Sequence, residues 1–166
     1  MAVVGWECAA RGGEASCRPM TEGDAIRNLL GRYCDLMDAG DWAGVGALFA
    51  HGALADENGT ELAAGADAVA RFYAAGTHLH DGSPRTKHLV TNTVLAEPAA
   101  DGSVTARSSY LVLQAVDGFP LQPIITGRYV DTFAPDPAAA GGWRFRQRRF
   151  AVDLVGDLSH HLRYAL

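Results

Sequence analysis

The hydrophobic pattern of this chain changes once, near residue 80, from a helical repeat to extended segments. Before this point apolar residues recur every three or four positions, which is the spacing of one face of an α-helix. After it, four long segments rich in valine, threonine and aromatic residues follow one another, separated by short links of Asp, Gly and Pro. Helices followed by closely linked strands predict an α+β domain with a mostly antiparallel sheet.

Three helices are expected in the first part. Thr21 can cap the longest one, and Asp24, three residues later, supports its positive end. The buried stripe of this helix is formed by Ile26, Leu29, Leu30, Tyr33, Cys34 and Met37. Asp41 can cap a second, short helix, whose buried face is formed by Trp42, Val45, Leu48 and Phe49. The third helix covers residues 67–75, and the turn-rich stretch before it has room for one short strand.

The four strand segments are KHLVTNTVLAE, SVTARSSYLVLQAV, PIITGRYVDTFA and GWRFRQRRFAVDLV. In the first of them, strict alternation places His88, Val90, Asn92 and Val94 on one face of the strand. Both faces of this strand are mixed in character, so alternation does not identify the inner one. Helices packed against one face of a bent antiparallel sheet enclose a pocket, which is a common ligand site.

The length of the chain fits one domain. Residues 21–166 are expected to form it, and residues 1–20, which lack periodicity, are expected to be a tail. The net charge of −5 offers no basic field for nucleic acid or anionic lipid, so the arginines of GWRFRQRRF are expected to form a solvated face opposite a core face. No segment approaches the ~20 apolar residues of a membrane span and no signal peptide is recognised, so the expected location is the cytoplasm.

Motifs for metals and cofactors are not found in the sequence. The cysteines are an odd and sparse set without Cys-x-x-Cys spacing, which suggests neither a disulfide framework nor a zinc site. They are Cys8, Cys17 and Cys34. Two close histidine pairs, His78/His80 and His160/His161, lack correctly spaced acidic or cysteine partners. No phosphate loop and no Gly-x-Ser-x-Gly turn occurs, so we expect no cofactor and no bound metal.

Three residues are candidates for proton transfer. Tyr33 lies in the middle of the first helix's apolar stripe, where its inward hydroxyl needs a polar partner, and this fits an ordinary core tyrosine equally well. Asp38 flanks the stripe near the end of the helix, where its charge opposes the helix dipole, whereas Asp35 points to solvent. His88 taken alone is typical of a structural histidine, but a carboxylate that orients its ring makes it a better general base.

Together and in this order, the runs AIRNLLGRYCDLMDAGDWAGVGALF, TKHLVTNTVL, GRYVDTF, GWRFRQRRF and DLVGDLSHHL resemble the SnoaL-like branch of the NTF2-like superfamily. The resemblance covers about residues 24–162. It implies an NTF2-like cone, in which N-terminal helices pack on a strongly curved, mostly antiparallel sheet and enclose a deep apolar cavity. This superfamily hosts many unrelated chemistries, so the fold alone does not name a reaction.

Within the superfamily, the chain is similar to the group of scytalone dehydratase, bile-acid 7α-dehydratase and hexachlorocyclohexane dehydrochlorinase, which perform cofactor-free eliminations with a His–Asp dyad. Asp38 matches the aspartate at the end of their first helix, and His88 matches their strand histidine. Tyr33 matches the tyrosine of the bile-acid enzyme, where the dehydrochlorinase has a lysine. The second acidic or histidine residue that some relatives carry on the next strand is not found, and Ser109 or Tyr110 occupies that neighbourhood.

The resemblance thus implies a lyase, isomerase or cyclase that uses no cofactor and acts on a small hydrophobic substrate of the polyketide or steroid type. In this hypothesis His88, held by Asp38, removes a proton, and Tyr33 donates a hydrogen bond to the developing negative charge. The residues expected to contact the substrate are Trp42, Phe72, Asn92, Tyr110 and Arg128.

Two further expectations concern the role and the assembly of the chain. The alternative to an enzyme is a non-catalytic ligand-binding module, or a scaffold that resembles the small subunit of an aromatic-ring-hydroxylating dioxygenase. Apolar residues occur at both alternations of SSYLVLQAV and GWRFRQRRF, which suggests burial on both faces of the sheet. A homo-oligomer is therefore expected, with a trimer favoured over a dimer.

Overall fold

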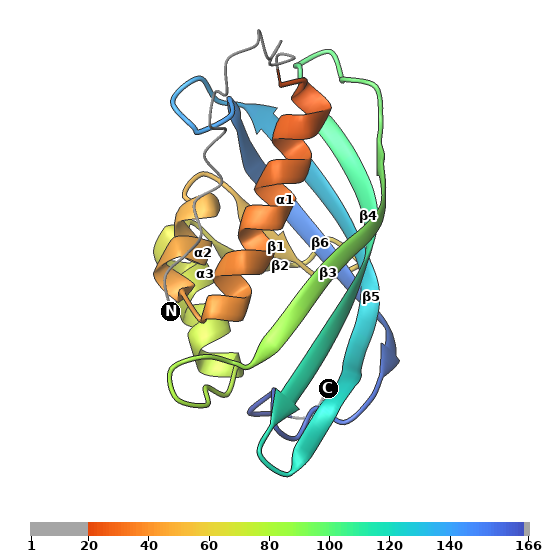
Figure 1. Cartoon of the computed structure of the whole chain (residues 1–166). Helices are drawn as coiled ribbons and strands as arrows, with labels where there is room; N and C mark the ends of the chain where they lie inside the picture. Colours follow the sequence, from red (N-terminus) through yellow and green to blue (C-terminus); the bar gives the residue numbers. More distant parts are fainter. Residues whose placement is uncertain (1–19, 165–166) are drawn as a thin grey trace, which may run out of the picture.

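A strongly curved sheet of six strands carries three helices on one face in the computed structural model, which describes residues 20–164 (Figure 1). The helices are α1 (Glu22–Ala39), α2 (Trp42–Leu48) and α3 (Ala66–Gly76). The strands are β1 (Ala53–Ala55), β2 (Glu61–Ala64), β3 (Thr86–Leu95), β4 (Val104–Val116), β5 (Phe119–Pro135) and β6 (Trp143–Val155). The expected α+β fold is confirmed. The expected tail, apart from Met20, lies outside the described residues, as do Cys8 and Cys17.

Helix α1 begins and ends where its sequence predicts. The Thr21 hydroxyl accepts a hydrogen bond from the Asp24 backbone N–H, and the Asp24 carboxylate accepts one from the Thr21 backbone N–H, both at 3.1 Å. Gly40 ends the helix in the left-handed conformation, with a φ of 71°. The helix buries the expected stripe toward the sheet, except that Leu29 is only half-buried. Asp35, on the opposite side, is exposed as expected.

The four long strands form the expected antiparallel meander, and the sheet order is β2-β1-β6-β5-β4-β3. Strand β5 begins at Phe119, earlier than the segment PIITGRYVDTFA predicts. The reason is a tight hairpin at Asp117-Gly118, in which Gly118 has a φ of 77° and Val116 pairs with Phe119. The residues expected to be a loop therefore belong to the strand.

The segment between α2 and α3 holds two short strands, where the sequence left room for one. Strand β1 pairs antiparallel with β2 and parallel with β6. This parallel pairing joins the helical part of the chain directly to its last strand. Gly52, just before β1, has no space for a side chain, because an added Cβ would lie 2.5 Å from the Phe145 carbonyl oxygen.

A β-bulge in β3 breaks the alternation that the sequence predicts. Asn92 has a φ of 54°, and the pairing of β3 with β4 shifts between Thr91 and Val94. His88 stays on the face that carries the helices, whereas Val94 is turned out and is 60% exposed. The expectation that Asn92 and Val94 share the face of His88 is therefore wrong, because the bulge adds one residue to the strand.

Two clusters of buried residues fill the space between helices and sheet. The larger one joins α1, α2 and α3 to the sheet. It includes Ile26, Phe49, Leu54, Val69, Phe133 and Phe145. The smaller one is formed mainly by β4 and β5 and includes Tyr110, Val112, Ile124 and Tyr129. Residues of both clusters line one cavity, which is described below.

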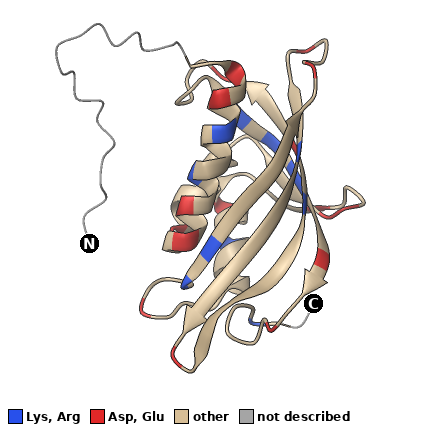
Figure 2. Cartoon of the chain, turned by 45° about the vertical axis from the view of Figure 1, so that its right-hand side comes forward, with Lys and Arg blue, Asp and Glu red and all other residues tan. Residues whose placement is uncertain are grey.

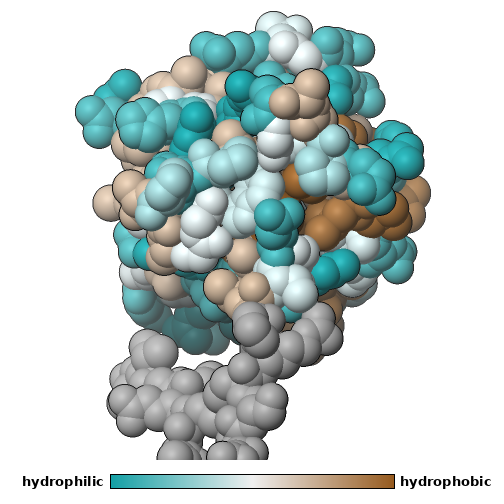
Figure 3. Space-filling view, turned by 90° about the horizontal axis from the view of Figure 1, so that it is seen from above, coloured by the Kyte–Doolittle hydropathy of each residue, from teal (hydrophilic) through white to brown (hydrophobic). Residues whose placement is uncertain are grey.

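The described surface mixes charges of both signs. Figure 2 shows acidic residues at both ends of α1 and in loops, and Lys and Arg along α1 and the strands. Seen from above, most of the surface is hydrophilic, and the hydrophobic residues gather in one patch at the right-hand side of the view (Figure 3). Within residues 20–164, no helix combines the length and the apolar character needed to cross a membrane.

Candidate functional site

A narrow cavity of about 130 Å³ lies between α1, α3, the inner face of the sheet and the C-terminal segment, which we define as residues 156–164. Most of its wall is aromatic or aliphatic. Its polar lining groups include Tyr33, Tyr73, His88, Tyr110, Tyr129 and His161. An apolar wall with a few polar side chains is the usual composition of a small-molecule site.

Asp38 lies in the last turn of α1, with its carboxylate against β3. Its Oδ1 accepts hydrogen bonds from His88 Nδ1 at 2.6 Å and from Thr86 Oγ1 at 2.9 Å, and the His88 backbone N–H lies 3.1 Å from both carboxylate oxygens. Burial raises the pKa of Asp38, but the hydrogen bonds and charge of His88, with Thr86, outweigh it and hold the pKa below its usual value. Asp38 is therefore ionised at neutral pH.

The hydrogen bond expected between His88 and Asp38 is thus present. The His88 side chain is 6% exposed and lines the cavity from β3. Because an ionised carboxylate can only accept hydrogen bonds, Nδ1 of His88 carries a proton. This leaves Nε2 as the ring nitrogen that can exchange a proton with a ligand.

Tyr33 lines the same cavity from α1, and its hydroxyl lies 2.8 Å from the hydroxyl of Tyr73 on α3. An inward hydroxyl at Tyr33 was expected to need a polar partner, and Tyr73 is that partner. Burial raises the pKa of Tyr33, and the nearby Arg148 opposes this rise. Tyr33 is therefore protonated at neutral pH and can donate a hydrogen bond.

An ion pair between Arg148 on β6 and Asp131 on β5 lies behind these tyrosines, and both side chains are fully buried. Two hydrogen bonds of 2.7 Å join Arg148 Nε and Nη2 to the carboxylate. The guanidinium carbon lies 4.1 Å from the ring centroid of Tyr33 and 3.9 Å from that of Tyr129. Burial lowers the pKa of Arg148, but Asp131 outweighs it and raises the pKa well above its ordinary value. The pair places a fixed positive charge beside the tyrosine rings.

Sequence reasoning missed this pair. It assigned the arginines of β6 to a solvated face, which holds for Arg146, whose side chain is half-exposed, but is wrong for Arg148. A register shift between β5 and β6 near Phe133 turns Arg148 inward. The sequence held one signal for this pair. Alternation within GRYVDTF places Asp131 on the same face as Tyr129 and Phe133, and a carboxylate buried among aromatic residues needs a cationic partner.

The structure divides the five residues expected to contact a substrate. Phe72 and Tyr110 line the cavity, and the Tyr110 hydroxyl donates to the Ala151 carbonyl. Asn92 and Arg128 are misplaced by the sequence analysis, because they line a separate hollow on the other face of the sheet. The bulge accounts for Asn92, and strand alternation places Arg128 outside, where it pairs with Asp153 at 2.9 Å.

Trp42 is also not part of the cavity wall. Its ring stacks on Tyr73, with centroids 6.2 Å apart, so it supports a lining residue from behind. Trp42 is the first residue of α2, and none of its atoms lines the cavity in which the substrate was expected to lie.

A second histidine reaches the cavity from the C-terminal segment. His161 is 7% exposed and lines the cavity, yet the sequence analysis weighed it only as half of a histidine pair. Burial is the largest of the causes that lower the pKa of His161 to about 4. The nearby imidazoles of His88, His78 and His80 lower the pKa further, whereas the charge of Asp38 raises it. His161 is therefore neutral at neutral pH. Within residues 20–164, no three His, Cys, Asp or Glu side chains are grouped to hold a metal ion.

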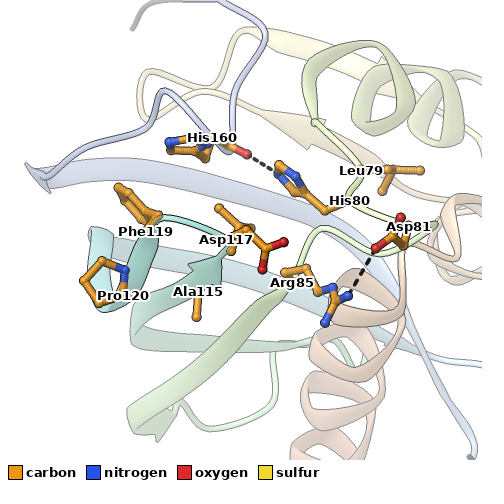
Figure 4. A pocket seen from close by; sticks show the side chains of 10 residues that line it. Leu79, His80, Asp81, Arg85, Ala115, Asp117, Phe119, Pro120 and His160 are labelled. Carbon is orange, nitrogen blue, oxygen red and sulfur yellow. Dashed lines mark hydrogen bonds and ion pairs between the residues drawn. The ribbon is translucent and has the colours of Figure 1, made fainter.

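A larger hollow of about 650 Å³ lies outside the cavity, between the loop before β3, the β4–β5 hairpin and His160 (Figure 4). It contains neither Asp38 nor His88, and its charged groups include Asp81 and Arg85, which pair with each other at 3.4 Å. Its wall is mostly polar, so it offers less contact to a hydrophobic ligand than the mostly apolar wall of the cavity does.

Comparison with known proteins was informative at the level of family and fold. A family model described as a SnoaL-like domain matches residues 18–149. No curated protein matches the sequence. Among solved structures, an NTF2-like protein with a cystatin-like fold from Novosphingobium aromaticivorans is 26% identical to this chain. The match covers 79% of this chain and 81% of that chain, with a TM-score of 0.59.

Two other structures from the same organism have names that describe a role. A candidate scytalone dehydratase is 20% identical, and the match covers 82% of this chain and 87% of that chain with a TM-score of 0.61. The β subunit of a candidate aromatic-ring-hydroxylating dioxygenase is also 20% identical, covering 80% of this chain and 89% of that chain with a TM-score of 0.58. At these identities, the likeness shows a shared fold alone.

The buried ion pair generates a prediction on stability. Arg148→Met leaves Asp131 buried without its partner, and we expect the free energy of unfolding to fall by about 3–5 kcal/mol. Arg148→Met combined with Asp131→Leu removes both charges, so most of that loss should be recovered. Urea unfolding followed by circular dichroism measures both variants. A double variant as unstable as the single one would contradict an origin in the unpaired charge.

The buried His161 generates a prediction on pH. Its pKa in the folded chain, about 4, lies below the ordinary value of 6.5, so the unfolded chain binds the proton more readily between these values. Stability therefore falls as the pH falls, and the part due to His161 is about 2 kcal/mol between pH 7 and pH 5. His161→Asn should remove this part from the pH dependence of urea unfolding. Identical pH dependence in both proteins would show that His161 is not held neutral by the fold.

Proposed function

The chain belongs to the family of SnoaL-like domains, and on this basis we propose that it is a cofactor-independent acid–base enzyme acting on a small hydrophobic substrate. The observation that carries the proposal is the 2.6 Å hydrogen bond between His88 Nδ1 and Asp38 at the wall of an apolar cavity. A carboxylate that orients an imidazole is the arrangement that a general base requires. Elimination, isomerisation and cyclisation can all begin with the proton abstraction that such a base performs.

His88 is the proposed base, and Asp38 is its positioning residue. A proton taken from the substrate goes to Nε2 of His88, because Nδ1 is already bonded to the carboxylate. The resulting imidazolium is stabilised by Asp38, which stays ionised throughout because its pKa is lowered. Thr86 fixes the carboxylate from the other side, so that the ring of His88 keeps one orientation.

Tyr33 and Tyr73 are the proposed donors to a substrate oxygen. The two hydroxyls carry two protons and use one of them in their mutual hydrogen bond, so one O–H remains for a ligand. The guanidinium of Arg148 lies behind the Tyr33 ring and favours negative charge that develops in front of it. In this proposal the tyrosines stabilise the developing oxyanion, and His88 removes the proton.

In the elimination form of the reaction, the C–H bond beside a carbonyl breaks and its proton moves to His88. The electron pair moves into the enolate, which then expels a hydroxyl group from the β-carbon. The departing oxygen takes the proton from His88 and leaves as water, so no oxidant, reductant or cofactor is consumed. In the isomerisation form, the same proton returns to a different carbon.

The second candidate function is non-catalytic, as a ligand-binding module or as a scaffold for a larger subunit. It is favoured by the structural likeness to the dioxygenase β subunit, because one fold can serve both roles. In this case the contact between Asp38 and His88 only fastens the end of α1 to β3.

The two functions differ in their response to loss of the base. For a probe we choose 3-hydroxycyclohexanone, a single-ring β-hydroxy ketone whose dehydration to 2-cyclohexenone is followed by ultraviolet absorbance. The enzyme should accelerate this reaction, and His88→Ala and Asp38→Asn should each lower the rate by ~10²–10⁴-fold, the usual contribution of a positioned acid–base group. Tyr33→Phe should have a smaller effect, since it removes one hydrogen bond and keeps the ring.

Asp35→Asn is the matched control, because it removes a carboxylate from the same helix at an exposed position, and its rate should equal that of the wild type. Circular dichroism verifies that each variant is folded. Equal rates for wild type, His88→Ala and Asp38→Asn would reject the base. A wild type that gives no acceleration over buffer would favour the binding module.

We further propose that the chain forms a homo-oligomer, with a trimer favoured over a dimer. The support is a set of large hydrophobic residues that are more than 40% exposed on the strands and do not line the cavity: Leu89, Val94, Leu121, Leu154 and Val155. Light scattering at micromolar concentration should give a mass above that of one chain, and Leu89→Lys with Val94→Lys should lower it. A monomeric mass for the wild type would refute the proposal.

A further inference from the structure

The C-terminal segment holds His161 firmly at the cavity. The His161 backbone N–H donates to the Leu158 carbonyl at 2.9 Å, and the His161 carbonyl accepts from the His78 backbone N–H at 2.8 Å. The next residue but one, Arg163, donates from its backbone to Gly76 and from its side chain to Thr77. These contacts tie the segment to the end of α3 and to the loop that follows it.

The residue before His161 is held equally well. The His160 carbonyl accepts hydrogen bonds from His80 Nε2 at 2.8 Å and from Gln114 Nε2 at 3.1 Å, and the first of these is visible in Figure 4. Gln114 is fully buried and also donates to the Pro84 carbonyl. These contacts fix the backbone on both sides of His161, and its side chain is buried, so the residue is held in place at the cavity before a ligand binds.

The two ring nitrogens of His161 differ in their surroundings. Nδ1 is buried and has no hydrogen-bond partner among the described residues, whereas Nε2 is not among the buried unpartnered atoms. A buried N–H without an acceptor costs more than a bare lone pair, so the proton of the neutral ring resides on Nε2. The low pKa, about 4, keeps the ring in this neutral form at neutral pH. Nε2–H is therefore a fixed, uncharged donor.

We propose, building on the proposed function above, that His161 is a second catalytic residue whose Nε2–H donates a hydrogen bond to the oxygen of a single-ring substrate, while His88 takes the proton. The size of the ligand follows from the cavity, because about 130 Å³ accommodates one six-membered ring. The substrate class is a small cyclic ketone or enol with few polar substituents.

His161 does not transfer a proton in this step. When His88 removes the proton beside the carbonyl, the electron pair moves through the new C=C bond onto the carbonyl oxygen. The Nε2–H of His161 donates to that oxygen and stays bonded to its nitrogen, because a neutral imidazole is too weak an acid to give the proton up. A neutral histidine can stabilise an enolate in this way without the loss of a charge. The proton that leaves with the hydroxyl group is the one held by His88.

Binding of two matched probes tests this contact without any turnover. Phenol is a planar ring with one oxygen, like the enolate, and toluene has a methyl group in its place. Calorimetric titration gives the ratio of the toluene Kd to the phenol Kd. His161→Phe should lower this ratio about tenfold, the value of one hydrogen bond, and should leave toluene affinity nearly unchanged. His161→Gln, whose amide nitrogen reaches the place of Nε2, should restore the ratio, and His161→Asn should not.

His51→Phe, at an exposed histidine outside the cavity, serves as the control and should keep the wild-type ratio. An unchanged ratio in His161→Phe would overturn the proposal, and so would failure of the wild type to bind either probe at millimolar concentration. A ratio that depends on His161, combined with a rate that does not depend on His88, would retain the contact and reject the enzymatic function. The two proposals therefore fail separately.

Discussion

The interior of this domain is organised around the ion pair of Arg148 and Asp131. The guanidinium lies over the ring of Tyr33, which belongs to the larger hydrophobic cluster, and over the ring of Tyr129, which belongs to the smaller one. A fully buried pair adds little net stability, since the desolvation of two charges offsets their attraction. Its consequence is positional, because the ring of Tyr33 on α1 packs against the guanidinium and lines the cavity.

A second contact fixes the other side of the cavity. A carboxylate at the end of a helix opposes the helix dipole, and Asp38 would be unfavourable there if it were merely solvated. Instead it receives two side-chain hydrogen bonds and a backbone N–H from β3, which satisfy its charge and bind the end of α1 to the sheet. The same contact that closes the fold at this point therefore orients the ring of His88.

The sequence predicted the structure correctly where the hydrophobic repeat is regular, and the prediction failed where a bulge or a register shift interrupts that repeat. The stripe of α1 and the capping by Thr21 followed from local rules, and the partnership of Asp38 with His88 came from family resemblance. Asn92 was misplaced by a bulge, and Arg148 was missed because a register shift changes which residues of β6 face inward. His161 follows the last strand, where no periodicity constrains the chain, so only tertiary hydrogen bonds place it.

The arrangement of charge around the cavity bears on the chemistry that it can support. None of the described residues that line it is Asp, Glu, Lys or Arg, yet ionised groups lie directly behind the lining. Asp38 is behind His88, and Arg148 is behind Tyr33 and Tyr129. Proton abstraction in an apolar space creates a cation on the base and an anion on the substrate, and separating them there is costly without fixed charges of the opposite sign nearby. Here the Asp38 carboxylate stands behind the base, and the Arg148 guanidinium, which is paired with Asp131, lies against the ring of Tyr33. The nearest charge on each side therefore has the sign that the proposed reaction needs.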